Sequence, residues 1–217
     1  YRKAAEVDVN PDMKKLALQY LVAAYGPDKL NDPTQAEPIV QEMIRIAPND
    51  PGNYFALARI YEDAGRYEEA EAALLKAQET NPQDVTVYVQ LSGFYNRQGE
   101  FDKTIEALNK AAEIRPDDPQ GHQLVATYYW EKAFKDHRLA NPVKKDYIMK
   151  GIEGTDRALK LNPDYVEALT YKNILLRMQA NLETDLGKRA ELLKEADQIR
   201  GRAMELQAKA AGTAKPK

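Results

Sequence analysis

The residue types that most often carry catalysis are scarce in this chain. It has two histidines, His122 and His137, a single serine, Ser92, and no cysteine. Neither histidine has a second histidine at the spacing that a zinc or iron site needs. The lack of cysteine excludes thiolate nucleophiles, thiolate metal ligands and disulfides, but it leaves the redox compartment open.

Each of these residues also has a structural interpretation. His122 occupies a position where a large side chain fills a helix interface, so packing is favoured over proton transfer. His137 lies beside Asp136 and Arg138 and is expected to be solvated. Ser92 falls at a small-residue position between two helices, where its hydroxyl would be buried and inert. We therefore expect no catalytic residue among them.

Carboxylates are abundant, but their arrangement does not favour acid–base catalysis. Glu68-Glu69 and Asp117-Asp118 are adjacent pairs at expected helix starts or turns, where they stabilise the positive end of the helix dipole. The sequence also lacks the GxGxxG and GxxxxGK[ST] strings that bind phosphates. The prediction is that the chain is not an enzyme and holds no cofactor or metal. A glycan hydrolase would rest on the abundance of Asp and Glu alone.

The helices expected to position these residues repeat along the chain. Residues 51–84 and 85–118 align at a fixed offset of 34, with bulky, small and turn-forming residues in register. This spacing predicts a first helix that ends at a glycine and a second helix that packs through small residues and stops at a proline. The matched positions are Tyr54, Leu57, Ala58, Tyr61, Gly65, Tyr67, Ala70, Leu74, Ala77 and Pro82, then Tyr88, Leu91, Ser92, Tyr95, Gly99, Phe101, Thr104, Leu108, Ala111 and Pro116.

On these residues the chain resembles the tetratricopeptide repeat (TPR) family, of the bacterial type. The resemblance implies an all-α fold, namely a right-handed superhelical solenoid of antiparallel helix pairs with a C-terminal capping helix pair. Extended outward, the pattern predicts a degenerate repeat over 11–50, repeats over 51–84 and 85–118, a repeat with an inserted loop over 119–163, and the capping pair over 164–210.

The two ends of the chain are expected to differ from the middle. Residues 1–10 resemble the end of a second helix without its first helix, because Tyr1, Ala4 and Val7 have the spacing of such a helix. An orphan half-repeat is either an edge on which another subunit stacks or a fragment boundary. Residues 211–217 are small and basic and are predicted to form a flexible tail.

The resemblance also implies where a partner would bind. In this family the first helices line a concave groove, and the second helices form the convex back. Polar groove residues would hold carboxylates or backbone amides of the partner, and apolar ones would anchor it. The corresponding positions are Phe55, Arg59, Glu62, Val89, Asn96, Arg97, Gln123, Thr127 and Trp130.

One use of this groove in the family does not fit the sequence. Chaperone-binding members hold a peptide carboxylate with lysine and asparagine at fixed groove positions. Those positions carry other residue types here, namely Phe55, Val89, Gln123, Arg59, Gly93 and Thr127. A carboxylate-clamp cochaperone is therefore disfavoured.

A second candidate contact lies in about 13 extra residues between the helices of the fourth repeat. The predicted loop, about 133–150, is either a partner-contacting loop or a lengthened connection. Trp130, the only tryptophan, is expected to anchor it. The candidate contact residues are Phe134, Lys135, Arg138, Lys144, Lys145 and Tyr147.

Charge is unevenly distributed along the chain. Residues 49–118 contain 14 acidic and 7 basic residues, whereas residues 172–217 contain 10 basic and 6 acidic ones. Such a distribution attracts copies of the chain head to tail or steers an unlike partner, and ordinary solvated helix faces explain it equally well. The net charge of −3 and the lack of a basic stripe with stacking aromatics disfavour nucleic acid as a partner. No apolar run approaches membrane-spanning length.

The sequence thus predicts a non-enzymatic protein–protein interaction scaffold whose partners are segments of other proteins. The alternative is a self-assembling structural protein that forms head-to-tail oligomers or filaments through its terminal helices. Because the first residue is not Met, we expect a removed leader or a longer parent protein, with an exported location slightly favoured over a cytoplasmic one.

Overall fold

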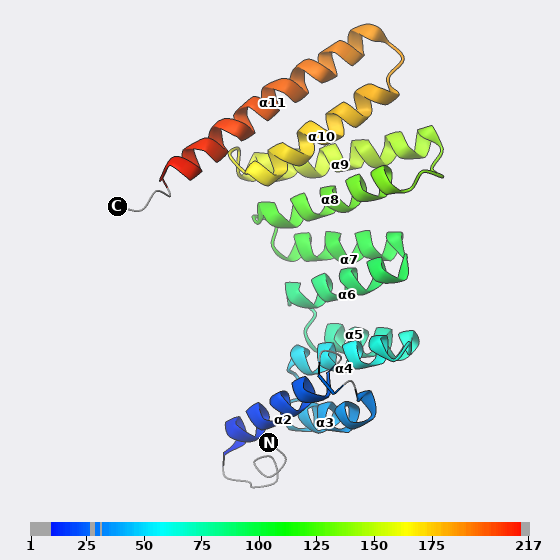
Figure 1. Cartoon of the computed structure of the whole chain (residues 1–217), viewed down its shortest axis with the longest axis vertical. Helices are drawn as coiled ribbons and strands as arrows, with labels where there is room; N and C mark the ends of the chain where they lie inside the picture. The colour runs from blue at the N-terminus through cyan, green and yellow to red at the C-terminus, as the bar shows by residue number, and fades with distance from the viewer. Residues whose placement is uncertain (1–9, 27–28, 31, 214–217) are drawn as a thin grey trace. The chain divides into compact units, whose positions relative to one another are not determined.

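Every regular element of the described residues is an α-helix (Figure 1). The structure, a computed structural model, describes residues 10–26, 29–30 and 32–213. Its helices are α2 (Pro11–Tyr25), α3 (Pro33–Ile46), α4 (Pro51–Asp63), α5 (Tyr67–Thr80), α6 (Val85–Gln98), α7 (Phe101–Ile114), α8 (Pro119–Lys135), α9 (Asn141–Leu161), α10 (Val166–Leu182) and α11 (Leu186–Thr213). The all-α class predicted from the sequence is confirmed.

By internal contacts the chain divides into two compact units, Tyr1–Ala107 and Leu108–Lys217. In the first unit α2 packs on α3, α3 on α4, α4 on α5 and α5 on α6. In the second unit α8 packs on α9, α9 on α10 and α10 on α11, and α8 also contacts α10. Within each unit, consecutive helices therefore pack as the antiparallel pairs that the repeat pattern predicts (Figure 1).

The helix starts repeat with the period of the sequence. Asp50, Asp84 and Asp118, each 34 residues apart, are the N-cap residues of α4, α6 and α8. Each carboxylate accepts a hydrogen bond from the backbone N–H two residues later, at 3.0, 2.8 and 2.9 Å. These bonds satisfy N–H groups that have no partner inside the helix, so they fix where each first helix begins.

The ends of α4 and α6 depend on two glycines. Gly65 and Gly99 have φ angles of 73° and 78°, in the left-handed region that favours glycine. The residue after each glycine donates its N–H to the carbonyl oxygen of Tyr61 or Tyr95, at 2.8 and 2.9 Å. This geometry ends the first helix and turns the chain into the second helix, as the sequence predicts.

The packing positions expected from the repeat are buried almost throughout. In the first helices Leu57 is the exception, because it is only half-buried. The Ser92 hydroxyl donates to the carbonyl oxygen of Val89 at 2.8 Å, so this buried serine contributes to packing, as expected. The buried positions are Tyr54, Ala58, Tyr61, Tyr88, Leu91, Ser92 and Tyr95 in the first helices, and Ala70, Leu74, Ala77, Thr104, Leu108 and Ala111 in the second helices.

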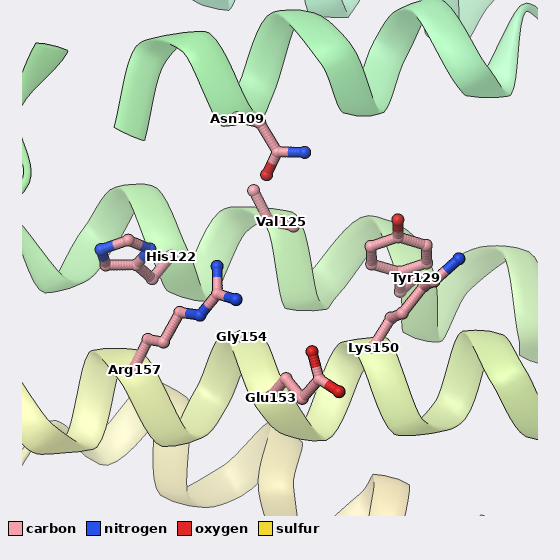
Figure 2. A pocket seen from close by; sticks show the side chains of 8 residues that line it. All are labelled: Asn109, His122, Val125, Tyr129, Lys150, Glu153, Gly154 and Arg157. Atoms are coloured by element: carbon pink, nitrogen blue, oxygen red, sulfur yellow. The ribbon is translucent and has the colours of Figure 1, made fainter. Parts of the chain in front are cut away.

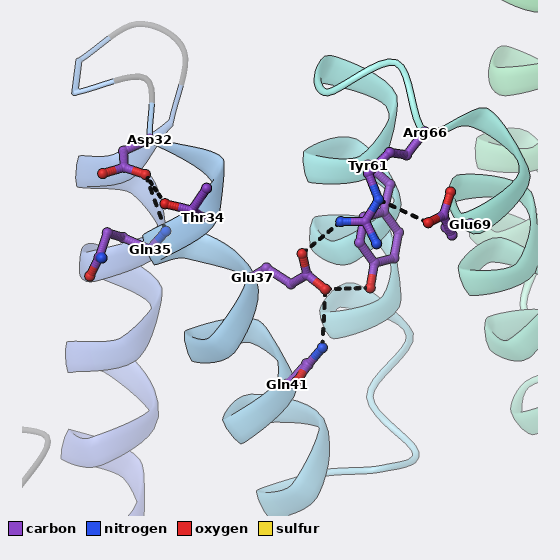
Figure 3. A network of polar contacts seen from close by, with 8 residues as sticks. All are labelled: Asp32, Thr34, Gln35, Glu37, Gln41, Tyr61, Arg66 and Glu69. Carbon is purple, nitrogen blue, oxygen red and sulfur yellow. Dashed lines mark hydrogen bonds and ion pairs between the residues drawn. The ribbon is translucent and has the colours of Figure 1, made fainter.

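A polar network ties α3, α4 and α5 together (Figure 3). The Tyr61 hydroxyl donates to Oε1 of Glu37 at 2.9 Å, and Arg66 donates to Oε2 of the same carboxylate at 2.8 Å. Arg66 also donates to Glu69 at 2.9 Å, and Gln41 donates to Glu37 at 3.3 Å. Because Glu37 already accepts three hydrogen bonds, its role is to lock neighbouring helix pairs rather than to act as a free acid or base.

The same arrangement recurs 34 residues later. The Tyr95 hydroxyl donates to Glu71 at 2.9 Å, and Lys103 donates to Glu71 at 3.2 Å. The Lys103 ammonium lies 5.0 Å from the centre of the Tyr95 ring. Burial, followed by the neighbouring carboxylate, raises the pKa of Tyr61 and of Tyr95 above the usual tyrosine value.

In the second unit, glycines let α9 approach its neighbours closely. A Cβ atom at Gly154 would lie 3.1 Å from the carbonyl oxygen of His122 and 3.1 Å from the Cβ atom of Ala126. A Cβ atom at Gly151 would lie 3.0 Å from a methyl carbon of Leu175. Larger residues at these positions would push α9 away from α8 and α10.

The extra residues of the fourth pair are helical rather than a loop. α8 continues to Lys135 and α9 begins at Asn141, so only residues 136–140 connect them. The expected loop over about 133–150 is therefore wrong for most of its length. An amphipathic segment can extend both helices when their buried faces continue, and Ala133 and Ile148 supply those faces here.

Two expectations for the chain ends concern residues near or beyond the described part. α11 extends to Thr213, so residues 211–213 are helical rather than part of a tail. Tyr1, Ala4 and Val7, the predicted stacking edge, lie outside the described residues, as do residues 214–217. The division of the chain into repeat units stays a prediction. Among the described residues, none of the helices has the length and apolar character to span a membrane.

Candidate functional site

The first helices of the first unit bring two predicted groove residues together. Arg97 of α6 donates from Nε and Nη2 to the two carboxylate oxygens of Glu62 in α4, at 2.6 and 2.9 Å. The Glu62 side chain is only 13% exposed, whereas that of Arg97 is half exposed. This bidentate pair joins two successive first helices and compensates the Arg97 charge.

Gly93 makes room for that pair. A Cβ atom at this position would lie 3.3 Å from Nη1 of Arg97, so a side chain here would press on the guanidinium. From the sequence alone, Gly93 is notable only because it differs from the lysine or asparagine that chaperone-binding members carry at the corresponding position. In the structure it allows Arg97 to lie along α6 toward Glu62.

The second groove arginine is also paired within the chain. Nε of Arg59 lies 3.0 and 3.1 Å from the two carboxylate oxygens of Asp63, one helical turn later on α4. Both arginines expected to hold a partner's carboxylate are thus already bound to a carboxylate of this chain. The reason is local: residues four apart on a helix are neighbours, and so are residues at equivalent positions of stacked helices.

Apolar and neutral groups complete this part of the candidate site. Phe55 of α4 and Val89 of α6 occupy equivalent positions 34 residues apart. Phe55 is half-buried, Val89 is 39% exposed, and Asn96 is exposed. We call these six residues, Phe55, Arg59, Glu62, Val89, Asn96 and Arg97, the first-helix surface.

The predicted groove residues of the second unit are less accessible than expected. Gln123 of α8 is buried, and its amide donates to the Thr127 hydroxyl at 2.7 Å. Thr127 in turn donates to the carbonyl oxygen of Gln123 at 3.1 Å. The Gln123 amide nitrogen and the Thr127 hydroxyl are therefore already engaged within α8.

Trp130 belongs to an aromatic group formed by α8 and α10. Its ring stacks on Phe134, with the ring centres 5.6 Å apart and 12° between the planes, and meets Tyr171 edge-on at 5.3 Å. It also packs against the core cluster that contains Ala133 and Ile148. Trp130 therefore holds the end of α8 and the start of α9 in place, while Phe134 remains exposed.

The predicted contact residues of the insertion are distributed over helix ends and a short connection. Phe134 and Lys135 end α8, Lys144, Lys145 and Tyr147 lie in α9, and Arg138 lies between the two helices. Lys145 forms an ion pair with Glu183 at 3.6 Å, and the Tyr147 ring contacts Tyr129 at 5.8 Å. The connection itself is fixed by Asp136. Hydrogen bonds from Arg138 and Lys132 lower the pKa of its carboxyl to about 2.

An apolar stripe on α2 was not predicted from the sequence. Met13, Leu16 and Tyr20 are 59%, 42% and 49% exposed, and their spacing of three and four residues puts them on one helix face. This spacing is present in the sequence. It was not recognised as a second apolar face because Leu18 and Leu21 already account for the buried face of the same helix.

Among the residues that the structure describes, no group of three histidine, cysteine or acidic side chains could hold a metal ion. His137 is exposed in the connection between α8 and α9, as expected. His122 is half-buried and lines a polar pocket between helices.

Comparison with known proteins identifies the class. Family models of the tetratricopeptide repeat match residues 29–91 and residues 85–118. Together with the helix pairs and the 34-residue spacing of their caps, these matches show that residues 29–118 consist of tetratricopeptide repeats. No curated protein is similar enough in sequence to count as a match.

Solved structures show the same fold at low sequence identity. A crystal structure of MamA is 16% identical, with a TM-score of 0.60 over 94% of this chain and 97% of that chain. MamA 41-end from Desulfovibrio magneticus RS-1 is 15% identical, with a TM-score of 0.56 over 90% and 96%. YrrB, described as a TPR protein with an unusual peptide-binding site, is 12% identical, with a TM-score of 0.53 over 95% and 96%. What the chain shares with these proteins is the fold.

Proposed function

We propose that this protein is an interaction scaffold whose first-helix surface binds a segment of another protein. The class supports the general statement, because tetratricopeptide repeats typically serve as non-enzymatic interaction modules. YrrB, which shares the fold, has a peptide-binding site, and this makes a peptide segment a reasonable occupant here.

The observation that carries the proposal is an exposed apolar centre beside a charged rim. Val89 and Phe55 leave apolar surface uncovered on α6 and α4, and the Glu62–Arg97 pair lies on the same two helices. Protein interfaces commonly combine an apolar anchor with polar groups at the edge. Because both arginines are paired within the chain, the apolar residues are the primary anchors.

A matched pair of variants tests this surface. Val89 on α6 and Leu75 on α5 are both 39% exposed, but they lie on a first and a second helix respectively. We expect Val89→Glu to reduce partner capture at least about tenfold, because a charge replaces an apolar anchor, and Leu75→Glu to leave capture unchanged. The measurement is quantitative mass spectrometry of proteins retained by each immobilised variant from an extract of the source cells.

Circular dichroism of both variants checks that they remain folded. Equal retention of every protein by Val89→Glu and by the wild type would remove the first-helix surface from consideration. Equal losses in both variants would show non-specific adsorption instead.

The stripe on α2 favours a second candidate function, self-assembly. Met13, Leu16 and Tyr20 are three large exposed side chains on one helix face. Such an apolar patch is unusual for a surface that contacts only solvent. A second copy of the chain could cover them, and repeated contacts of this kind form oligomers or filaments. Sedimentation velocity across protein concentration distinguishes this function from the scaffold.

A further inference from the structure

A polar pocket of about 210 Å³ lies among α8, α9 and the C-terminal part of α7, all within the second unit (Figure 2). Its floor is formed by one face of α8, through His122, Val125 and Tyr129. Asn109 extends from α7 on one side, and Glu153 and Arg157 extend from α9 on the other. The volume fits one side chain rather than a large cofactor.

Close helix packing creates this pocket. Gly154 of α9 lines the pocket. Because this residue has no side chain, α9 can approach the backbone of α8 closely. Gly121 does the same on the other side, since a Cβ atom there would lie 3.3 Å from Ala112 of α7. The three helices therefore hold the pocket's walls at a fixed separation.

The polar groups of the pocket are not satisfied by one another. No hydrogen bond or ion pair with a described residue is formed by the side chains of Asn109, His122, Glu153 or Arg157. Lys150 differs, because it forms an ion pair with Asp146 at 2.9 Å and lies 5.9 Å from the centre of the Tyr129 ring. The cation available to a ligand is therefore Arg157.

These groups match one kind of ligand. Arg157 offers the planar fork that binds a carboxylate through two parallel hydrogen bonds. The Asn109 amide and the His122 imidazole are further N–H donors around the same cavity. We propose that this pocket binds the carboxylate of an acidic side chain in a segment of a partner protein.

Glu153 explains why the ligand is an acidic residue of a protein and not a free phosphate. A phosphate carries about 1.5 to 2 negative charges at neutral pH, and the Glu153 carboxylate repels it more strongly than it repels a single carboxylate. The same carboxylate accepts a hydrogen bond from a backbone N–H next to the bound side chain. Glu153 thus favours a singly charged carboxylate side chain over a phosphate group in the pocket.

The pocket is separate from the predicted groove face of α8. His122, Val125 and Tyr129 follow one face of this helix, whereas Gln123, Thr127 and Trp130 lie roughly a third of a turn away. The pocket is therefore a second binding site, and it does not depend on the first-helix surface of the first unit.

The test uses two peptides that differ only in charge. Fluorescein-labelled (Asp-Gly)5 and (Asn-Gly)5 are titrated with the full chain at low ionic strength, and binding is measured by fluorescence anisotropy. We expect the Asp peptide to bind at least about tenfold more tightly than the Asn peptide. Arg157→Gln should remove most of this preference.

Arg200→Gln is the matched control. Arg200 is exposed on α11, outside the pocket, and its substitution changes the net charge of the chain equally. We expect this variant to bind the Asp peptide as the wild type does. Circular dichroism checks that Arg157→Gln and Arg200→Gln keep their helices.

A competition experiment tests the role of Glu153. Inorganic phosphate should displace the Asp peptide poorly from the wild type and several-fold better from Glu153→Gln, because the repelling charge is gone. Three results would overturn the proposal: equal affinity for both peptides, equal losses in Arg157→Gln and Arg200→Gln, or phosphate that displaces the peptide equally well from the wild type and from Glu153→Gln.

Discussion

Arg97 illustrates how pairing within the chain changes what an exposed residue can recognise. A partner carboxylate that approaches this arginine must compete with Glu62, which already accepts hydrogen bonds from Nε and Nη2 of the guanidinium. The Glu62 side chain is only 13% exposed, so displacing it would leave a largely buried carboxylate without its partner, and the competition gains little. This balance is why the proposed function rests on Val89 and not on the arginine.

Tyr95 carries a pH-dependent part of the stability. Its hydroxyl donates to Glu71, and burial raises its pKa above that of an unfolded tyrosine, which is 10.0. We expect Tyr95→Phe to lower the free energy of unfolding by about 1 kcal/mol at pH 8. Above about pH 10 the unfolded tyrosine loses its proton before the folded one, so this contribution declines as pH rises.

Urea unfolding of the wild type and Tyr95→Phe at pH 8 and pH 11 measures this effect. The stability difference between the two proteins should shrink at the higher pH. Tyr67→Phe serves as the control, because Tyr67 is exposed and should give little difference at either pH. A difference for Tyr95→Phe that stays constant or grows with pH would contradict the assignment.

At the scale of elements, the helix ends are set by residues that repeat every 34 positions. Aspartates begin α4, α6 and α8, and glycines in the left-handed conformation end α4 and α6. These signals are local, because they involve only backbone groups within one or two turns. They fix where each helix begins and ends before any tertiary contact is made.

Two glycine substitutions separate backbone strain from packing. At Gly99 and at Gly201 an added Cβ atom would meet no other atom within 4 Å. We expect Gly99→Ala to destabilise the fold by about 1 kcal/mol, because alanine is strained at positive φ. Gly201→Ala lies within α11 and should stabilise it by about 0.5–1 kcal/mol.

Urea midpoints followed by circular dichroism report both changes. The two substitutions add the same methyl group in equally open surroundings, so only the backbone conformation differs between them. Shifts of the same sign would show that the left-handed turn after α6 does not carry the strain assigned to it.

The chain forms two compact units, and within each unit neighbouring helices pack on one another. A stack of this kind ends in helix faces that no further repeat covers, and these faces decide whether the protein stays monomeric. In the described residues, the stripe Met13, Leu16 and Tyr20 on α2 is such a face. If the protein self-associates, we expect this stripe, rather than a single residue, to form the contact.

If a second copy covers that stripe, Leu16→Glu should weaken self-association at least about tenfold, since burying a leucine contributes about 1.5–3 kcal/mol. Leu161→Glu is the control, because Leu161 on α9 is 40% exposed, close to the 42% of Leu16. Sedimentation velocity over a wide concentration range gives the association state of each protein. A wild type that remains monomeric throughout would exclude self-assembly through α2.

Much of the fold could be predicted from the sequence, and less of the candidate site. The face of each helix that is buried follows from the spacing of Tyr54, Ala58 and Tyr61, because helical periodicity fixes which residues share a face. The length of α9 could not be predicted, since an insertion has no matching repeat to compare with. Arg97 was correctly placed on a first helix, but its partner Glu62 could not be deduced.

The amino-acid sequence alone determined that this chain forms helix pairs and where most of them begin and end, because caps, turns and periodicity act over a few residues. Only the tertiary structure decided which polar side chains meet. The Glu62–Arg97 pair joins residues 35 positions apart, and the pocket joins Asn109, His122 and Arg157 from three helices. Such contacts depend on the distance between packed helices, which close-approach residues such as Gly154 set and which periodicity does not encode.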